Sequence, residues 1–187
     1  MGDRRDPERT RVALLDAALV EFAAHGRAGA RTSAIAARAG VNKQLISHHF
    51  GGKEGLYRAL VERWEADEAS YGGPDTPLAD LVARYVEDAI RQRDLHRLLL
   101  RAALDDEEHS GGLDADDLAD MRRRQQAGEV TDRLDPAFLL LMLQATTAAG
   151  IVFPGDVRRL TGIEPTSPSF ATWHAEQLRK FVQTLAG

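Results

Sequence analysis

The 187-residue chain contains no cysteine, and glycine and proline are not in excess. The lack of cysteine excludes disulfides, zinc–thiolate sites and cysteine nucleophiles. Hydrophobic residues make up 43% of the chain and charged residues 28%, which indicates a soluble globular protein, neither disordered nor fibrous. The N-terminal stretch is polar and lacks the apolar run of a secretory signal, so we expect a cytoplasmic protein.

Long hydrophobic runs are also scarce. Residues 137–153 form the one segment apolar enough to be considered for a membrane span. This segment is at the short limit for crossing a bilayer, and it contains Gln144, Thr146 and Thr147. We therefore expect a helix buried on two sides by protein, and no membrane partner.

Recognisable catalytic motifs are missing. The sequence has no Gly-rich phosphate loop, no Gly-x-Ser-x-Gly and no His-Glu-x-x-His. His48 and His49 are adjacent, and neighbouring residues of a helix point about 100° apart, so they rarely share a metal ion. The acidic run at 105–112 lacks the residue order of a calcium loop and is expected to be a solvated loop. We predict no enzyme activity, no metal and no cofactor.

What the sequence does contain is a series of capped amphipathic helices, without sustained strand-type alternation. The first is expected to begin at Asp6-Pro7 and to end at Gly26. Further helices are expected to start near residues 32, 42, 53, 77, 94, 113, 136, 155 and 168. The pattern predicts an all-α fold.

A Gly/Pro-rich stretch at residues 70–77 indicates a domain boundary. We expect a helix-turn-helix domain over residues 1–52, a connecting helix over about 53–69, and a second domain over 70–187. Residues 1–53 contain nine Lys/Arg and five Asp/Glu, whereas the remainder contains 15 and 24. A basic head on an acidic body is typical of a protein whose head alone meets phosphates.

The functional motif is a pair of short helices joined by Ala39-Gly40-Val41. Gly40 permits a sharp turn and Val41 fills the space beneath it, so the first helix braces the second against a major groove. Thr32 and Asn42 are expected to cap the two helices. The outward face of the second then carries Lys43, Gln44, Ser47 and His48. Gln44 is the best base reader, because a glutamine can bond adenine through two hydrogen bonds.

Residues 31–60 resemble the DNA-binding head of TetR-family regulators. The matching positions are Thr32, Ala39-Gly40-Val41, His49-Phe50 and Lys53-Glu54-Gly55-Leu56. The resemblance implies an effector cavity in the body and a dimer interface on the last two long helices. Many members have a small residue where Gln44 stands and a tyrosine where Ser47 or His48 stands, so the operator sequence does not carry over from relatives.

These patterns give three groups of candidate site residues. The DNA-binding group is Arg31, Thr32, Ser33, Asn42, Lys43, Gln44, Ser47, His48 and Lys53. The effector-pocket group, drawn from helices expected to converge, is Tyr85, Leu99, Met121, Gln125, Phe138, Met142 and Thr146. The dimer-interface group, expected to form a four-helix bundle across a two-fold axis, is Phe138, Leu141, Ala145, Phe170, Trp173, Leu178, Phe181 and Leu185.

The sequence therefore predicts a homodimeric regulator that binds double-stranded DNA at a pseudo-palindromic operator. We expect a repressor that an unknown small-molecule effector releases from DNA. Two alternatives remain open. One is a helical small-molecule-binding protein or enzyme with a vestigial head, and the other is an architectural DNA-binding protein without effector control.

Overall fold

The computed structural model describes residues 6–73, 75–104 and 112–186. Within these ranges all regular secondary structure is helical, which confirms the all-α prediction. No helix of the described residues is long and apolar enough to cross a membrane. Most of the acidic run at 105–112, which we expected to be a solvated loop, lies outside the described residues.

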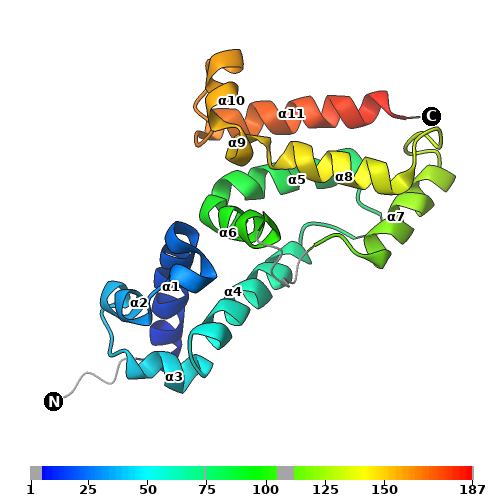
Figure 1. The fold of residues 1–187 in the computed structure, drawn as a ribbon. Helices are drawn as coiled ribbons and strands as arrows, with labels where there is room; N and C mark the ends of the chain where they lie inside the picture. Colours follow the sequence, from blue (N-terminus) through cyan, green and yellow to red (C-terminus); the bar gives the residue numbers. More distant parts are fainter. Residues whose placement is uncertain (1–5, 74, 105–111, 187) are drawn as a thin grey trace. The chain divides into compact units, whose positions relative to one another are not determined.

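The chain divides into two compact units, which we call the head unit and the body unit (Figure 1). The head unit comprises the described residues of Met1–Glu68 and Arg97–Gly111, and the body unit those of Ala69–His96 and Gly112–Gly187. The head unit contains α1 (Pro7–Gly29), α2 (Thr32–Ala39), α3 (Gln44–Phe50) and α4 (Lys53–Glu68). The body unit contains α5 (Leu78–Arg91), α7 (Ala115–Gln126), α8 (Pro136–Thr147), α9 (Ala149–Val152), α10 (Pro154–Thr161) and α11 (Pro168–Thr184).

Helix α6 (Arg93–Leu104) is shared between the two units, with the division after His96. The sequence led us to expect all of residues 70–187 in one domain and a separate connecting helix before it. The structure differs because Leu98 is buried in the head unit's hydrophobic core, so the second half of α6 packs there. Helix α4 also belongs to that core through Leu56 and Leu60.

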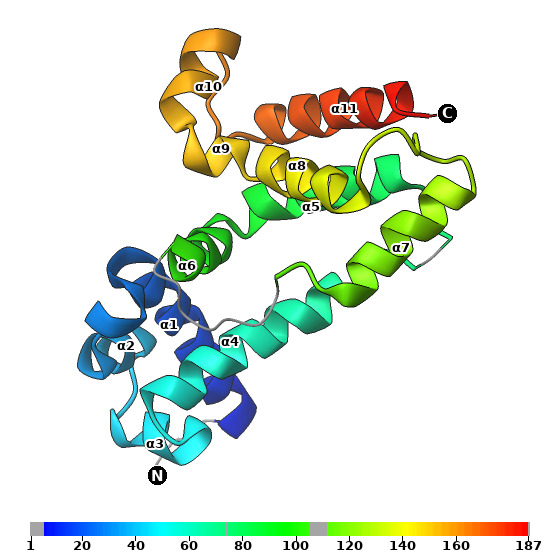
Figure 2. The ribbon, with the colours of Figure 1, turned by 45° about the vertical axis from the view of Figure 1, so that its right-hand side comes forward.

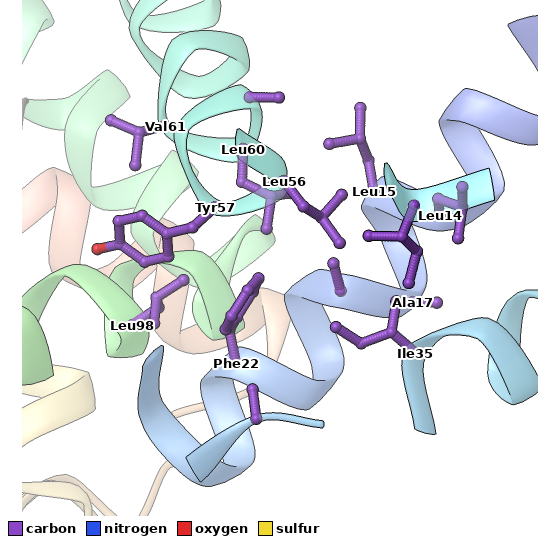
Figure 3. Close-up of a cluster of buried hydrophobic side chains, with 14 of the residues drawn as sticks. Leu14, Leu15, Ala17, Phe22, Ile35, Leu56, Tyr57, Leu60, Val61 and Leu98 are labelled. Carbon is purple, nitrogen blue, oxygen red and sulfur yellow. The ribbon is translucent and has the colours of Figure 1, made fainter. Parts of the chain in front are cut away.

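The core of the head unit lies between α1, α2, α4 and the second half of α6. Figure 3 shows Leu15 and Phe22 of α1 facing Leu56 and Leu60 of α4, and each of these side chains is almost fully buried. The Phe22 and Tyr57 rings meet edge to face, with centroids 5.5 Å apart. Burying a side chain of this size contributes about 1.5–3 kcal/mol, so this cluster holds the short helices α2 and α3 in place.

Helix α1 is interrupted at Gly26, where we expected it to end. Gly26 has a non-helical backbone with φ 70° and ψ 172°, and a short second helical segment then runs on to Gly29. That segment is held from α4, because Arg27 forms an ion pair with Glu54, with 2.5 Å between Nη2 and Oε2. The Lys53 ammonium also donates to the backbone carbonyl of Ala28 at 3.1 Å.

In the body unit, α11 packs mainly against α5, while α8 packs against α7 and α5 (Figure 2). Their shared core includes Val82, Val86, Leu139 and Leu178. Polar groups are buried as well, and Asp88 and Arg124 are paired with neighbouring side chains. Arg124, only 1% exposed, is the largest of them and joins three segments of the unit.

Candidate nucleic-acid interface

The turn between α2 and α3 has the predicted geometry. Gly40 is left-handed, with φ 65° and ψ 35°. The amide of Val41 donates to the carbonyl of Ala36 at 3.0 Å, which closes the end of α2 in a Schellman-type cap. The Val41 side chain is partly buried against the head unit's core, as the sequence predicted. The turn therefore fixes the start of α3 relative to α2.

The two expected caps have different outcomes. The N-cap residue of α3 is Lys43 and not Asn42 as expected, but the Asn42 side chain does accept a hydrogen bond from the first helical amide, that of Gln44, at 2.8 Å. Thr32 was wrongly predicted as a cap, since it is the first helical residue of α2 and Arg31 precedes it as N-cap, without a side-chain bond. The amide of Arg31 instead donates to the Glu21 carboxylate at 3.2 Å, which ties the start of α2 to α1.

Helix α3 presents one face to the core and the other to solvent. Ile46 is buried, and Leu45 and Phe50 are partly buried against the head unit's core. The opposite face exposes the predicted DNA-binding side chains Lys43, Gln44, Ser47 and His48. Arg31, Ser33 and Asn42 are exposed as well, and Thr32 is partly buried. The structure thus places hydrogen-bond donors along the outer side of α3.

A close approach between α3 and α4 fixes the other end of α3. Gly51 and Gly52, with φ 73° and 123°, turn the chain out of α3. A Cβ atom at Gly55 would lie 1.7 Å from the carbonyl oxygen of Phe50, so only glycine fits there. The sequence analysis quoted Gly55 within a motif but did not recognise this role. A glycine in the first turn of a helix is the signal that could have found it.

Lys53 has a different role from the one predicted. Its ammonium donates to the carbonyls of Ala28 and Ala30, at 3.1 and 3.5 Å, and so caps the end of α1. Two further arginines of the head unit were not in the predicted group. The Arg11 guanidinium lies 5.4 Å from the centre of the Phe50 ring, and Arg38 is exposed on α2. Neither placement has a sequence signal, because both depend on how α1 and α2 pack.

The predicted effector-pocket residues do not share one surface. Met121 is buried in the body unit's core, while Phe138 and Met142 are 50% and 40% exposed. The Gln125 amide is occupied, since it donates to the carbonyls of Thr131 and Leu134 at 2.9 and 2.8 Å.

The other three members of that group also have partners elsewhere. Leu99 packs against the head unit's core. The Thr146 hydroxyl donates to carbonyls within α8, and Tyr85 packs edge to face on Tyr71. Their grouping in one effector pocket therefore stays a prediction.

The predicted dimer-interface residues fall into two sets. Phe170 is 1% exposed and Leu178 is 6% exposed, so both fill the interior of the body unit and have almost no surface left for a partner. Their assignment to an interface is therefore corrected. The other members retain accessible surface: Phe138, Leu141, Ala145, Trp173 and Phe181 are exposed, and Leu185 is partly buried.

A braced helix-turn-helix with an outward row of donors defines a class, the helix-turn-helix DNA-binding proteins. The model of the family described as bacterial regulatory proteins, tetR family, matches residues 14–60. The chain is 34% identical to the HTH-type transcriptional repressor SCO4008 of Streptomyces coelicolor, over 84% of this chain and 86% of that protein. It is 29% identical to the HTH-type transcriptional regulator RutR of Escherichia coli, over 91% of this chain and 87% of that protein.

Solved structures agree with this assignment. A transcriptional regulator of Streptomyces coelicolor, SCO4942, superposes with a TM-score of 0.68 at 24% identity, covering 94% of this chain and 97% of that chain. GusR of Salmonella enterica superposes with a TM-score of 0.63 at 21% identity, covering 99% of each chain. The chain belongs to the TetR family of bacterial transcriptional regulators. It is a DNA-binding regulator.

Proposed function

We propose that the protein is a homodimeric repressor that inserts α3 of each head into the major groove of a pseudo-palindromic operator. The exposed row of Lys43, Gln44, Ser47 and His48 on a helix braced from behind is the observation that carries this proposal. The 34% identical relative is named a repressor, which supports repression as the output. Regulators of this family bind DNA and usually act as dimers.

Each exposed side chain of α3 has a definable task in this proposal. Gln44 reads a base edge, because its amide can donate and accept at one adenine. Lys43 binds phosphate or a guanine edge. Ser47 and His48, one turn further along α3, contact the backbone or a flanking base. Arg31 and Ser33 at the start of α2 contact the phosphates beside the groove.

Dimerisation is supported by the exposed apolar side chains of the body unit. Phe138, Leu141 and Met142 of α8 are 50%, 60% and 40% exposed, and Phe181 of α11 is 41% exposed. Large apolar side chains exposed in this number mark an interaction site. An isologous dimer would bury it and would present two α3 helices about 34 Å apart, one helical turn of DNA.

Effector control is the second part of the proposal. Helix α6 belongs to the body unit up to His96 and to the head unit from Arg97, so one helix is shared by both. A ligand that favours one conformation of the body can therefore alter the head through α6. The change in DNA affinity cannot exceed the ligand's differential affinity for the two states.

Selection of duplexes from a randomised DNA library by the purified protein tests this function. The selection is made at about 150 mM salt, where non-specific phosphate binding is weak. We expect an inverted repeat to be enriched, with its half-sites one helical turn apart. Gln44→Ala should lose the enrichment at specific positions, whereas the exposed α7 variant Arg122→Ala should keep it. Enrichment of no sequence would leave an architectural binder as the better description.

Light scattering at micromolar concentration tests the dimer separately. We expect a dimer for the wild-type chain and a monomer for Leu141→Glu, because a buried unpaired carboxylate is costly at an apolar interface. Leu113→Glu, at a similarly exposed leucine outside α8 and α11, is the matched control and should remain dimeric. A monomeric wild-type protein would contradict the proposal.

A further inference from the structure

A groove in the body unit, away from the residues that the sequence suggested for a pocket, is formed by α9, α10 and α11. Its volume is about 510 Å³, within the range of small-molecule sites. Figures 1 and 2 show α9 and α10 at the end of the body unit where α11 begins. The side chains that matter for its chemistry are Phe153, Val157, Leu160, Phe170, Trp173 and His174.

Aromatic rings on successive turns of α11 line one side of the groove. The ring centroids of Phe170 and His174 are 5.1 Å apart, and those of Phe170 and Trp173 are 5.8 Å apart. Phe170 is fixed from below, since a Cβ atom at Gly150 would lie 2.5 Å from its ring. Phe153 adds a further ring that is 55% exposed. A flat aromatic molecule could therefore stack on a surface that is already formed.

The polar groups of the groove are satisfied, with one exception. The Thr161 hydroxyl donates to the carbonyl of Val157 at 2.7 Å and accepts from the amide of Ile163 at 3.1 Å. The Asp156 carboxylate is paired with Arg159. Among the described residues of the groove, His174 is only 8% exposed, and yet its Nδ1 atom has no hydrogen-bond partner. A buried polar atom in this state is costly unless a ligand or water completes it.

The protonation state of His174 decides what kind of group can bind there. Burial lowers the pKa of His174, and a hydrogen bond to the Thr146 backbone offsets this only in part, so the ring is neutral at pH 7. Either nitrogen of a neutral imidazole can carry the proton, so Nδ1 can serve as a donor or as an acceptor. A hydroxyl group satisfies Nδ1 in both cases, because it can donate and accept.

We propose that this groove binds an aromatic small molecule of about two fused rings that carries one hydroxyl group, which forms a hydrogen bond with Nδ1 of His174. The exposed rings of Phe153 and Trp173 would stack on the aromatic part, and the buried Phe170 ring would support Trp173 from within the unit. An anionic ligand is disfavoured, because Asp156 lies in the lining and the neutral imidazole adds no positive charge. The inference deepens the proposed function, on which it rests, by giving the effector a site and a chemical class.

The two tryptophans of the chain provide a direct test, because Trp173 lines the groove and Trp64 is buried in the head unit. Full-length protein labelled with 5-fluorotryptophan gives two fluorine resonances, and Trp173→Phe assigns them. The labelled protein is titrated with 2-naphthol and with naphthalene, which has the same rings but no donor. We expect 2-naphthol to shift the Trp173 resonance saturably, with at least about tenfold higher affinity than naphthalene.

Two variants separate the hydrogen bond from the stacking. His174→Phe keeps a ring and should bind both probes with similar affinity, whereas the matched control His25→Phe, at an exposed histidine of the head unit, should keep the preference for 2-naphthol. Equal affinities of the two probes for the wild-type protein would overturn the inference. It would also be overturned if the Trp173 resonance showed no saturable shift, which is the result expected if a second copy covers the groove. Selection of DNA by ligand-free protein tests the regulator independently, so the two proposals can fail separately.

Discussion

Gly55, in the first turn of α4, lies so close to the Phe50 carbonyl oxygen that a Cβ atom would approach it to 1.7 Å. Real Cβ atoms do not come so near to an oxygen, and the atom concerned is backbone, which cannot swing aside. The end of α3 and the start of α4 can therefore lie in this close contact only because Gly55 has no side chain. The orientation of α3 in the head depends on this contact.

Gly55→Ala should consequently destabilise the head unit. The added methyl group must push α3 and α4 apart, and overpacking of this kind costs about 1–3 kcal/mol. Urea unfolding, followed by circular dichroism and by the fluorescence of the buried Trp64, measures the loss. Gly73→Ala is the control, because nothing lies within 4 Å of its added Cβ and its effect should be near zero. Equal stabilities of the two variants would contradict this account.

Asp88 is a buried carboxylate of the body unit and is only 2% exposed. Its carboxylate accepts hydrogen bonds from Gln92 Nε2 at 2.9 Å and from His96 Nε2 at 3.1 Å, and it pairs with Arg91. Burial alone would raise the pKa of Asp88, but the hydrogen bonds from His96, Gln92 and Arg91 outweigh it and hold this pKa well below its usual range.

This depressed pKa makes stability depend on pH in a definite direction. The ionised Asp88 stabilises the fold above its unfolded-state pKa of about 3.9, and this contribution is lost as pH falls through the acid range below about pH 4. Asp88→Asn should lose about 3–5 kcal/mol at pH 7, and its stability should fall less steeply between pH 5 and 3. The exposed pair of Asp80 and Arg179, 3.2 Å apart, offers the control Asp80→Asn, with a loss below about 1 kcal/mol.

Arg124 joins three segments of the body unit from a fully buried position. Its guanidinium lies 2.6 Å from Asp120 and 2.9 Å from both Glu129 and the carbonyl of Thr76. Arg124→Met should cost about 3–5 kcal/mol, because the carboxylates keep their charge and lose their partner. Thermal unfolding should show a clearly lower midpoint than for Arg122→Met, at an exposed arginine of the same helix. Unchanged midpoints for both variants would show that the buried ion pairs contribute no net stability.

The head could be predicted from sequence because its signals are local. Gly40 must be left-handed and Asn42 bonds an amide two residues away, so each requirement is met within a few positions of the chain. The body could not be predicted in the same way. Helix α8 is apolar on all sides, so no periodicity distinguishes the buried Leu139 from the exposed Leu141. Which apolar side chain fills the core is decided by α5 and α7, far away in sequence.

The same reason explains why the sequence did not separate buried from exposed side chains in the predicted pocket and interface. Met121 and Met142 look alike in the sequence, but α7 turns the first into the core and α8 leaves the second in solvent. Phe170 and Trp173 belong to one helix, and only the first is buried completely. The groove beside them was missed because it depends on α10, which the sequence showed only as a short extra helix.

The side chains on the exposed face of α3 allow a final prediction about DNA binding, in which contacts to phosphate are distinguished from contacts to bases. A lysine that neutralises one phosphate adds about 0.9 to the slope of log K against log salt for B-DNA, whereas a glutamine that reads a base adds nothing. If Lys43 contacts phosphate, Lys43→Ala should lower the slope by about one per protomer and weaken all sequences alike. Gln44→Ala should keep the slope and lose about 1–3 kcal/mol on the selected operator only.

Fluorescence anisotropy from about 50 to 300 mM salt, on the selected operator and on a scrambled duplex, measures both quantities. Arg122→Ala, exposed on α7, is the charge-matched control and should change neither the slope nor the preference. If Lys43→Ala instead removes the preference and leaves the slope intact, Lys43 reads guanine, the other role that its exposed position allows. If neither variant changes either quantity, α3 does not enter the groove, and the DNA contact must lie elsewhere on the head unit.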